Sequence, residues 1–437
     1  MKADNIRNVI RYLQKFKNAT VVIYLDDKTI ESPLFSSHIR DIALLHQAGI
    51  KVVIIPGARS RIDQLLTAEK IGWEYKDGCR VTDTDAMAVI KMAAFDVSNI
   101  VMTNLAANDI NAIIGNWVRS RAKGVLKGFD FGTAGEIDRL NTEALRKVLD
   151  DGFIPIFPCI GWNESGRPYN ISSVSLAQEV AINLSADKLF YVMAGKAINK
   201  EEWKIPEGFA LSEEGDVPAM NLEEVDEFIS QNASAAVDES HSDVISVLKM
   251  AKSACQRGVT RVHLVDGNMD GVLPCEIFSD LGSGTMVYTS NYGKIRAMTH
   301  TDIPAVMGIM RPFIEKGNLL ERTEQQLAGE LSDFVVYEID GGVHACAALH
   351  FYADGQAEIA AVAVDENFSH MGIGLKLVEH LIAVAKRRTA GSIFIMTTQA
   401  ADWFERLGFE QGNIESLPEA RKALWNKKRN SKVYRLR

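Results

Sequence analysis

A short glycine-containing loop near residue 370 has the composition of a phosphate-binding turn. An apolar segment, 358–364, is followed by Ser369-His370-Met371-Gly372-Ile373-Gly374-Leu375, where an amphipathic helix is predicted to start. Glycines let the backbone approach a ligand closely, and free N–H groups at the start of a helix attract phosphate. The pyrophosphate of coenzyme A is one ligand that this arrangement could bind, and a plain tight turn into a helix is the alternative.

Glu358, which opens the same apolar segment, is the candidate catalytic base. An amine that attacks a thioester must first lose a proton, and a carboxylate could accept it directly or through water. Backbone N–H groups of Val362 or Ala363 could stabilise the oxyanion. Each residue also has a plain structural interpretation, as a polar strand start or a strand-forming side chain. The residues predicted to contact acetyl-CoA are Val362, Ala363, Val364, Ser369, His370, Met371, Gly372, Ile373, Gly374 and Leu375.

Length and composition predict a soluble chain of more than one domain. At 437 residues, two or three domains are expected. The sequence has no run of about eighteen uncharged apolar residues, so no membrane span is predicted. The net charge of −9 argues against general nucleic-acid binding. The five cysteines lack C-x-x-C spacing, so neither a metal site nor a disulfide framework is predicted. A chain without disulfides is typical of a reducing compartment, which predicts a cytoplasmic location. The cysteines are Cys79, Cys159, Cys255, Cys275 and Cys346.

Residues 1–290 alternate strand-like apolar runs with helix-like segments. The strand candidates cover 20–24, 51–55, 153–157, 188–192 and 261–265, and the helix candidates cover 37–47, 83–95, 173–184 and 244–256. This alternation predicts an α/β domain built on a mostly parallel sheet. A preceding segment, 5–16, has apolar residues at helical spacing and could pack on the domain or on a neighbouring subunit.

A smaller α+β unit is predicted from residue 295 to 437. Glycine-containing segments at 282–285 and 291–294 mark the boundary. The strand candidates cover 294–297, 334–339, 343–352, 358–364, 392–397 and 432–436, and the helix candidates cover 302–315, 375–388 and 400–407. These elements would place the glycine loop between a strand and a helix, with Glu358 at the start of that strand.

The C-terminal unit resembles the GNAT N-acetyltransferase family over about residues 296–437. The glycine loop carries part of the resemblance. The segment 402–409, which reads Asp-Trp-Phe-Glu-Arg-Leu-Gly-Phe, is similar to the family's ending of an aromatic residue followed by Leu-Gly-Phe. The resemblance implies an acetyltransferase that uses acetyl-CoA. It also implies that Thr397, at the strand end where many members have Tyr, donates a hydrogen bond to the departing thiolate. Members usually have Arg or Gln at the position of Ser369, so one pyrophosphate contact is missing here.

The N-terminal unit resembles the amino-acid kinase fold, in particular N-acetylglutamate kinases, over about residues 1–290. The segment 78–83, Gly-Cys-Arg-Val-Thr-Asp, is similar to their acetylglutamate-binding segment, and 276–285 is similar to the end of the arginine-sensitive members. The lysine and glycines that bind phosphate are missing, because the first strand ends in Tyr24-Leu25-Asp26-Asp27. Two added carboxylates would repel ATP, so a three-layer α/β domain with a regulatory role and no kinase activity is predicted.

The order of the two units resembles that of bacterial N-acetylglutamate synthases. The resemblance implies acetyl transfer from acetyl-CoA to the amine of L-glutamate, in arginine biosynthesis, with L-arginine as effector. Arg311 and Arg429 match arginines that hold the substrate in this family, and guanidinium groups bind carboxylates in a bidentate manner. Because Arg311 precedes Pro312, the helix is expected to kink or end there. The candidate effector residues are Tyr12, His263, Glu276, Gly282 and Gly284, with Glu276 pairing with the effector guanidinium.

Two other functions stay open on the sequence. The chain could acetylate another amine, such as a polyamine or a protein lysine, or it could be a non-catalytic sensor of arginine or acetylglutamate. Arginine could inhibit or activate the enzyme. A homo-oligomer, for which a hexamer is one form, is expected, and neither nucleic acid nor a membrane is an expected partner.

Overall fold

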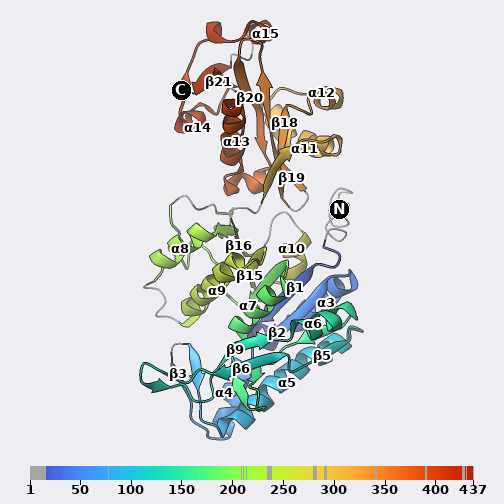
Figure 1. Cartoon of the computed structure of the whole chain (residues 1–437), viewed down its shortest axis with the longest axis vertical. Coiled ribbons are helices and arrows are strands. Elements are labelled where there is room, and N and C mark those ends of the chain that lie inside the picture. Colours follow the sequence, from blue (N-terminus) through green and yellow to red (C-terminus); the bar gives the residue numbers. More distant parts are fainter. Residues whose placement is uncertain are drawn as a thin grey trace. The chain divides into compact units, whose positions relative to one another are not determined.

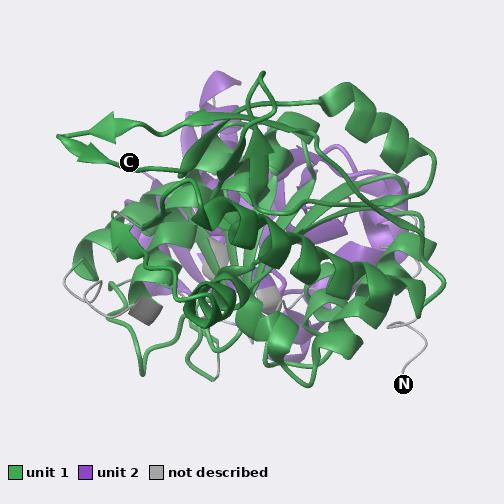
Figure 2. Ribbon diagram, turned by 90° about the horizontal axis from the view of Figure 1, so that it is seen from below, with its two compact units in different colours: residues 1–290 green, residues 291–437 purple. Residues whose placement is uncertain are grey.

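The chain folds into two compact units, Met1–Ser290 and Asn291–Arg437, which are coloured separately in Figure 2. The structure is a computed structural model that describes residues 16–76, 78–207, 209, 211–212, 214–233, 239–278, 283–289, 293–339, 342–388, 391–425, 429 and 431–436. Tyr12, Gly282 and most of the predicted helix 5–16 lie outside the described residues. Each unit has its own sheet and its own buried core.

Unit 1 is built on an eight-stranded sheet in the order β14-β16-β15-β13-β1-β2-β10-β5 (Figure 1). Neighbouring strands run parallel except for β15 and β16. The central strands are buried on both faces, which explains their continuous apolar sequences. The strands are β1 (Thr20–Leu25), β2 (Lys51–Pro56), β5 (Ala112–Ile114), β10 (Ile154–Ile156), β13 (Lys188–Met193), β14 (Ala219–Asn221), β15 (Arg261–Asp266) and β16 (Thr285–Tyr288).

Helices cover both faces of this sheet and complete three layers. Along β1, Val21 and Ile23 belong to one core while Val22 and Tyr24 belong to the other, as the alternation of side chains along a strand requires. The predicted three-layer α/β domain is confirmed. The first core includes side chains of α3 (Phe35–Gln47), α4 (Arg59–Ala68), α5 (Ala86–Ala106) and α10 (Val272–Phe278), and the second includes those of α6 (Thr142–Asp150), α7 (Ser173–Leu184), α8 (Leu222–Gln231) and α9 (Glu239–Gln256).

Helix α5 is, among the described residues, the one helix long and apolar enough to cross a membrane by length and composition. Part of its surface is buried inside unit 1, where Ile90, Ala93, Val97 and Val101 join the core. Helix α5 is therefore a core helix of this unit.

A second, four-stranded sheet in the order β12-β11-β6-β9 and two short hairpins complete unit 1. The sequence analysis does not predict these strands, because they are short and several carry charged or exposed side chains. They are β3 (Glu74–Lys76), β4 (Cys79–Val81), β6 (Val118–Ala122), β7 (Val125–Leu126), β8 (Phe129–Asp130), β9 (Gly135–Leu140), β11 (Ile160–Trp162) and β12 (Pro168–Asn170).

Unit 2 contains a seven-stranded sheet in the order β17-β18-β19-β20-β21-β23-β22. Its strand pairs are antiparallel except for β20 and β21, which are parallel. Helix α11 contributes Val306 and Met310 to a core with Phe334 and Val336, and α13 packs against β19 and β20. The elements are β17 (Lys294–Ala297), α11 (Ile303–Glu315), α12 (Glu324–Gly329), β18 (Phe334–Ile339), β19 (Gly342–Phe351), β20 (Gln356–Val364), α13 (Ile373–Arg387), β21 (Ser392–Thr397), α14 (Ala401–Arg406), β22 (Phe409–Gln411), α15 (Glu419–Ala423) and β23 (Lys432–Leu436).

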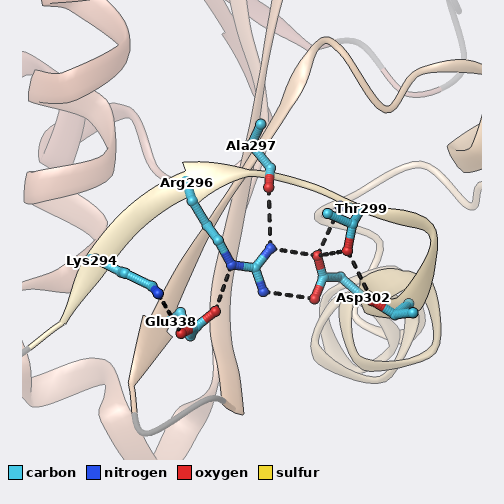
Figure 3. Close-up of polar contacts among 7 residues, drawn as sticks. Lys294, Arg296, Ala297, Thr299, Asp302 and Glu338 are labelled. Carbon is cyan, nitrogen blue, oxygen red and sulfur yellow. Dashed lines mark hydrogen bonds and ion pairs between the residues drawn. The ribbon is translucent and has the colours of Figure 1, made fainter.

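A network of charged groups fixes the start of α11 against the sheet (Figure 3). Arg296 on β17 donates to both carboxylate oxygens of Asp302, at 2.6 and 2.9 Å, and to Glu338 on β18 at 2.5 Å. Lys294 pairs with Glu338 at 3.0 Å, and the backbone N–H of Thr299 donates to Asp302 at 2.8 Å. These hydrogen bonds, above all those from Arg296, lower the pKa of Asp302 to about 2.

Helix α11 does not end at Arg311, so of the two outcomes expected there the end of the helix is excluded and the kink stays a prediction. It continues to Glu315 with Pro312 inside. A proline removes one backbone hydrogen bond, but its carbonyl still accepts from the N–H of Lys316 at 3.1 Å, so the last turn closes. Arg311 lies on the exposed side of the helix.

Candidate active site

Strands β20 and β21 pair over part of their length and then separate. Their parallel pairing ends at Ile359 and Ile395, although β20 continues to Val364. Ala361 has a φ of +52°, and the register of β19 against β20 shifts at this point, which marks a β-bulge. Beyond Ile359, the edge of β20 that faces β21 has no strand partner among the described residues. Its backbone groups are available for a ligand, and acyl-CoA stays the predicted ligand at this edge.

The N-terminus of α13 lies directly after this open edge in the sequence. Gly372 precedes the helix with a φ of +63°, a conformation that glycine adopts without strain, and no side chain caps the helix. The N–H groups of Ile373, Gly374 and Leu375 have no acceptor inside the helix, because the helical bonds begin with Lys376 N–H to the Gly372 carbonyl. These N–H groups and the positive end of the helix dipole fit a pyrophosphate.

Ser369 is engaged within its own turn. Its hydroxyl donates to the carbonyl of Glu366 at 2.8 Å. Its hydroxyl hydrogen is therefore already used and does not replace the contact expected from Arg or Gln at this position. The side chains of His370 and Met371 lie outside the described ones, so their predicted contacts with acetyl-CoA stay predictions.

Glu358 is buried near the start of β20 and accepts two hydrogen bonds. Its residue surface is only 3% exposed. The hydroxyl of Tyr352 donates to Oε2 at 2.6 Å, and Nε of Arg421 donates to the same oxygen at 2.8 Å. This position contradicts the alternative interpretation of a strand-start residue facing solvent. Glu358 stays the candidate base.

Two threonine hydroxyls lie at the end of β21. Oγ1 of Thr397 accepts a hydrogen bond from the N–H of Ala400 at 2.9 Å, which leaves its own hydroxyl hydrogen free to donate. Oγ1 of the neighbouring Thr398 is buried and has no partner among the described residues. Thr398 is therefore a second candidate for the contact with the departing thiolate.

Three arginines lie close enough to influence one another electrostatically. Burial, together with the positive charges of Arg421 and Arg322, lowers the pKa of Arg429. Nη2 of Arg429 donates to the carbonyl of Asn318, while its Nε is buried without a partner among the described residues. No contact among the described residues brings the exposed Arg311 into this group. In this Arg322–Arg421–Arg429 group, Arg322 pairs with Glu330 at 3.3 Å and Arg421 pairs with Glu358, so it is Arg429 that has a guanidinium nitrogen left for an anionic ligand among the described residues.

Sequence reasoning missed Tyr352, Arg322, Arg421 and Thr398. Arg421 lies in a basic segment of the chain, 421–437, which the composition alone marks as positively charged. Nothing in the sequence connects it with Glu358, because 63 residues separate the two. The signal comes only from the fold, which returns α15 to the start of β20.

His263 and Glu276 form a buried pair at the predicted effector site of unit 1. Nδ1 of His263 lies 2.7 Å from Oε1 of Glu276. The backbone N–H groups of Ser283 and Gly284 donate to Oε2 at 2.7 and 3.1 Å. The predicted residues His263, Glu276 and Gly284 thus come together, while Tyr12 and Gly282 lie outside the described residues.

The electrostatics of this pair leave one ring nitrogen free. Burial and the charge of Lys188 lower the pKa of His263 to about 4, so the ring is neutral at pH 7. Burial raises the pKa of Glu276, but the hydrogen bond from His263 and the charge of Lys188 outweigh it and lower the pKa overall. Since Nδ1–H donates to the carboxylate, Nε2 is an acceptor, and it is buried without a partner among the described residues.

The end of β1 carries carboxylates where the related kinases have their phosphate-binding residues. Asp26 accepts hydrogen bonds from the N–H of Thr29 at 2.7 Å and of Ala194 at 3.2 Å. Asp27 accepts from the N–H of Ser60 at 2.7 Å and from the Ser60 hydroxyl. Ser60 lies in the first turn of α4, so Asp27 provides an anion at that helix N-terminus. The protein's own carboxylates thus occupy N–H groups that could otherwise bind phosphate.

Two family models match the chain. The amino acid kinase family model matches residues 20–266, more than half of the chain, and the acetyltransferase (GNAT) domain model matches residues 330–411. The amino-acid acetyltransferase of Vibrio vulnificus is 34% identical over 438 residues, which cover 97% of this chain and 96% of that protein. The chain belongs to the amino-acid acetyltransferase family. The Escherichia coli K12 member is 31% identical over 98% of this chain and 96% of its own length.

Solved structures also resemble this amino-acid acetyltransferase over its whole length. N-acetylglutamate synthase from Neisseria gonorrhoeae is 29% identical, and the alignment covers 100% of this chain and 99% of that one. The TM-score is 0.77 for its complex with coenzyme A and L-arginine and 0.62 for its complex with coenzyme A and N-acetyl-glutamate. The resemblance to N-acetylglutamate synthases is confirmed. This amino-acid acetyltransferase is an acyltransferase that uses acetyl-CoA.

Proposed function

We propose that this amino-acid acetyltransferase transfers the acetyl group of acetyl-CoA to the amine of L-glutamate under the control of L-arginine. The observation that carries the choice of substrate is Arg429, whose buried Nε has no partner among the described residues and whose guanidinium group is free to bind a carboxylate. An amine that bears two carboxylates matches this charge, whereas a polyamine does not. The similar Neisseria enzyme, solved with N-acetyl-glutamate and with L-arginine, supports the same substrate and effector.

In this mechanism Glu358 accepts a proton from the glutamate ammonium group, directly or through a water molecule. The free amine then attacks the carbonyl carbon of the acetyl thioester, and a nitrogen–carbon bond forms. The negative charge that develops on the carbonyl oxygen is stabilised by backbone N–H groups of Val362 or Ala363 on the open edge of β20. The nitrogen, which carries a positive charge after the attack, loses its second proton to solvent, and the carbon–sulfur bond breaks to release the thiolate of coenzyme A and leave the amide.

Residues at the end of β21 assist that release. The hydroxyl of Thr397 or of Thr398 donates a hydrogen bond to the developing thiolate. A threonine hydroxyl of ordinary acidity acts as a donor here and not as a strong acid, so the thiolate takes its proton from solvent.

Substrate carboxylates are held by guanidinium groups. Arg429 has a buried Nε with no partner among the described residues, which a carboxylate would satisfy, and Arg311 offers an exposed group on α11. The carboxamide oxygen of Asn318 also lacks a partner among the described residues and lies next to Arg429, so it can accept from the substrate ammonium group.

L-Arginine binds at the His263–Glu276 pair of unit 1. Glu276 supplies the carboxylate for the guanidinium group, and Nε2 of His263 supplies an acceptor. Coupling between arginine binding in unit 1 and acetyl transfer in unit 2 requires two conformations that differ in affinity for arginine, with a coupling free energy of about 1–3 kcal/mol. The direction of the effect follows from which conformation catalyses.

We also propose a homo-oligomer. Helix α5 leaves Met92, Phe95 and Ile100 between 37 and 56% exposed, although they are apolar. Exposed apolar groups on one helix favour a subunit contact. Light scattering after gel filtration would give a multiple of the chain mass, and a monomer at all concentrations would refute the proposal.

Release of coenzyme A with a panel of amines tests the substrate assignment. We expect turnover with L-glutamate and little or none with a polyamine or a lysine peptide. Glu358→Gln should lower kcat by about 10²–10⁴-fold, because the base is lost while the shape is kept. Glu379→Gln, at an exposed position of α13, is the matched control and should retain wild-type kcat. Preferred acetylation of a cationic amine would overturn the proposal.

A further inference from the structure

The two donors to Glu358 meet at a single carboxylate oxygen. The Tyr352 hydroxyl and Nε of Arg421 both bind Oε2, at 2.6 and 2.8 Å. The side chains of Glu358 and Arg421 are only 4 and 15% exposed. An ionised carboxylate oxygen offers about two acceptor positions, so these two bonds fill Oε2. Oε1 is the oxygen that remains for the substrate.

Both donors are held in place by the fold. Tyr352 begins the turn between β19 and β20, where its N–H donates to the carbonyl of Gln356 at 2.9 Å, and its ring centroid lies 5.8 Å from that of Phe394. Burial and the charge of Glu358 raise the pKa of Tyr352, so its hydroxyl keeps its proton. Arg421 is permanently charged and reaches Glu358 from α15. Neither group can take the place of the base, and both keep the same orientation through the reaction.

We propose that Arg421, together with Tyr352, is a positioning residue for acyl transfer, because it binds one oxygen of Glu358 and thereby directs the other toward the amine. This inference rests on the proposed role of Glu358 as the base. Rotation of the carboxylate would exchange the two oxygens and is prevented as long as Oε2 keeps both partners. Loss of one partner lets the carboxylate turn, and displacement of a catalytic group by about 1 Å can cost about 10²-fold in rate.

A different role for Arg421 would give different kinetics. As a member of the Arg322–Arg421–Arg429 cluster, it could instead bind a substrate carboxylate. Removal would then raise KM for glutamate and leave kcat unchanged. A purely structural ion pair would change neither constant once the protein is folded, so the split between kcat and KM separates the three roles.

The experiment compares Arg421→Ala, Arg421→Lys and Tyr352→Phe in the full-length chain. Lys422→Ala is the matched control, since Lys422 lies next to Arg421 on α15 and pairs with Glu419. We expect Arg421→Ala to lower kcat by about 10²-fold with less than about a threefold change in KM for glutamate. Tyr352→Phe should lower kcat by about tenfold, the effect of one hydrogen bond to a charged group. Lys422→Ala should behave as wild type, and Arg421→Lys should recover part of the lost kcat.

Chemical rescue adds a readout that a structural role would not give. Ethylguanidinium added to Arg421→Ala should restore part of kcat, because it can refill the place beside Oε2, and it should have no effect on Glu358→Gln. If Arg421→Ala does not fold, the kcat values of Arg421→Lys and Tyr352→Phe still test the positioning role. Unchanged kcat in these variants, or an increase confined to KM, refutes the positioning role even when Glu358→Gln is inactive. Full activity of Glu358→Gln would instead refute the base assignment itself.

Discussion

Gly372 permits a test of the coenzyme A loop in which shape and charge are separated. Its φ of +63° disfavours most side chains, although Asn and Asp adopt such conformations more readily than other residues. A Cβ at this position would have nothing within 4 Å, so no clash is expected. Gly372→Asn and Gly372→Asp therefore share a backbone cost of about 1 kcal/mol and have nearly the same shape. They differ by one negative charge at the N-terminus of α13.

The size of the charge effect follows from Coulomb's law. Two unit charges about 4 Å apart interact by about 1 kcal/mol in water and about 4 kcal/mol at an effective dielectric constant of about 20. Gly372 is exposed, so the lower end applies, and the pyrophosphate carries two charges. We expect Gly372→Asp to bind acetyl-CoA with about 2 kcal/mol less free energy than Gly372→Asn, which is about a 30-fold higher Kd.

Titration calorimetry at two salt concentrations would measure this difference. The Debye length falls from about 10 Å at about 0.1 M salt to about 3 Å at about 1 M. The ratio of the two dissociation constants should therefore shrink several-fold at high salt. Equal affinities for the Asn and Asp variants would show that the pyrophosphate does not bind at the start of α13.

Arg429→Gln should raise KM for glutamate by about 10–100-fold, because a charge-assisted hydrogen bond to the substrate is lost, and KM for acetyl-CoA should stay near wild type. A change in kcat alone would show that Arg429 does not bind the substrate. Glu276→Gln should weaken arginine binding, measured by calorimetry, by a similar factor. Glu179→Gln, which removes the surface ion pair with Arg257, is the control. Normal arginine binding by Glu276→Gln would disprove the effector site. With ATP, magnesium and acetylglutamate, no ADP should form, because Asp26 and Asp27 already accept hydrogen bonds from the N–H groups of Ala194 and Ser60 that a phosphate would need. Measurable ADP would contradict that reasoning. Burial lowers the pKa of His263 to about 4, so between pH 6.5 and about 4 the unfolded chain binds a proton that the folded chain does not. The free energy of unfolding should therefore fall on acidification in this window, by up to about 1.4 kcal/mol per pH unit, and His263→Gln should flatten that part of the curve.

The large elements could be predicted because their signals are local. A strand buried on both faces, such as β1 or β13, must be apolar throughout, and the sequence shows this directly. The glycine loop before α13 could also be predicted, since Gly372 adopts the positive φ that glycine tolerates best. The bulge at Ala361 gives no such signal, because the conformation is imposed by strand pairing on a residue that does not favour it.

Only some residues of the candidate site could be predicted, because the others are brought together by contacts that are not local in the sequence. Glu358 could be singled out as a charged residue at the start of an apolar strand. Its partners depend on contacts between distant segments, since Arg421 arrives from a short helix after β22 and Tyr352 from the preceding turn. The short strands of the second sheet in unit 1 were missed because their stability comes from tertiary contacts and not from their own composition.

The carboxylates of Asp26 and Asp27 also bear on how such a domain changes over generations. If unit 1 descends from an active kinase, its backbone N–H groups once depended on an external phosphate. Here the chain supplies the anion, so these donors are satisfied whether or not a nucleotide is present. A single reversion that removed one carboxylate would leave buried donors unpaired, at about 1–3 kcal/mol each, without restoring the missing lysine. Sequences between the present domain and an active kinase are therefore less stable than either of the two. This difference in stability opposes the return of phosphate chemistry and keeps the domain in its present role.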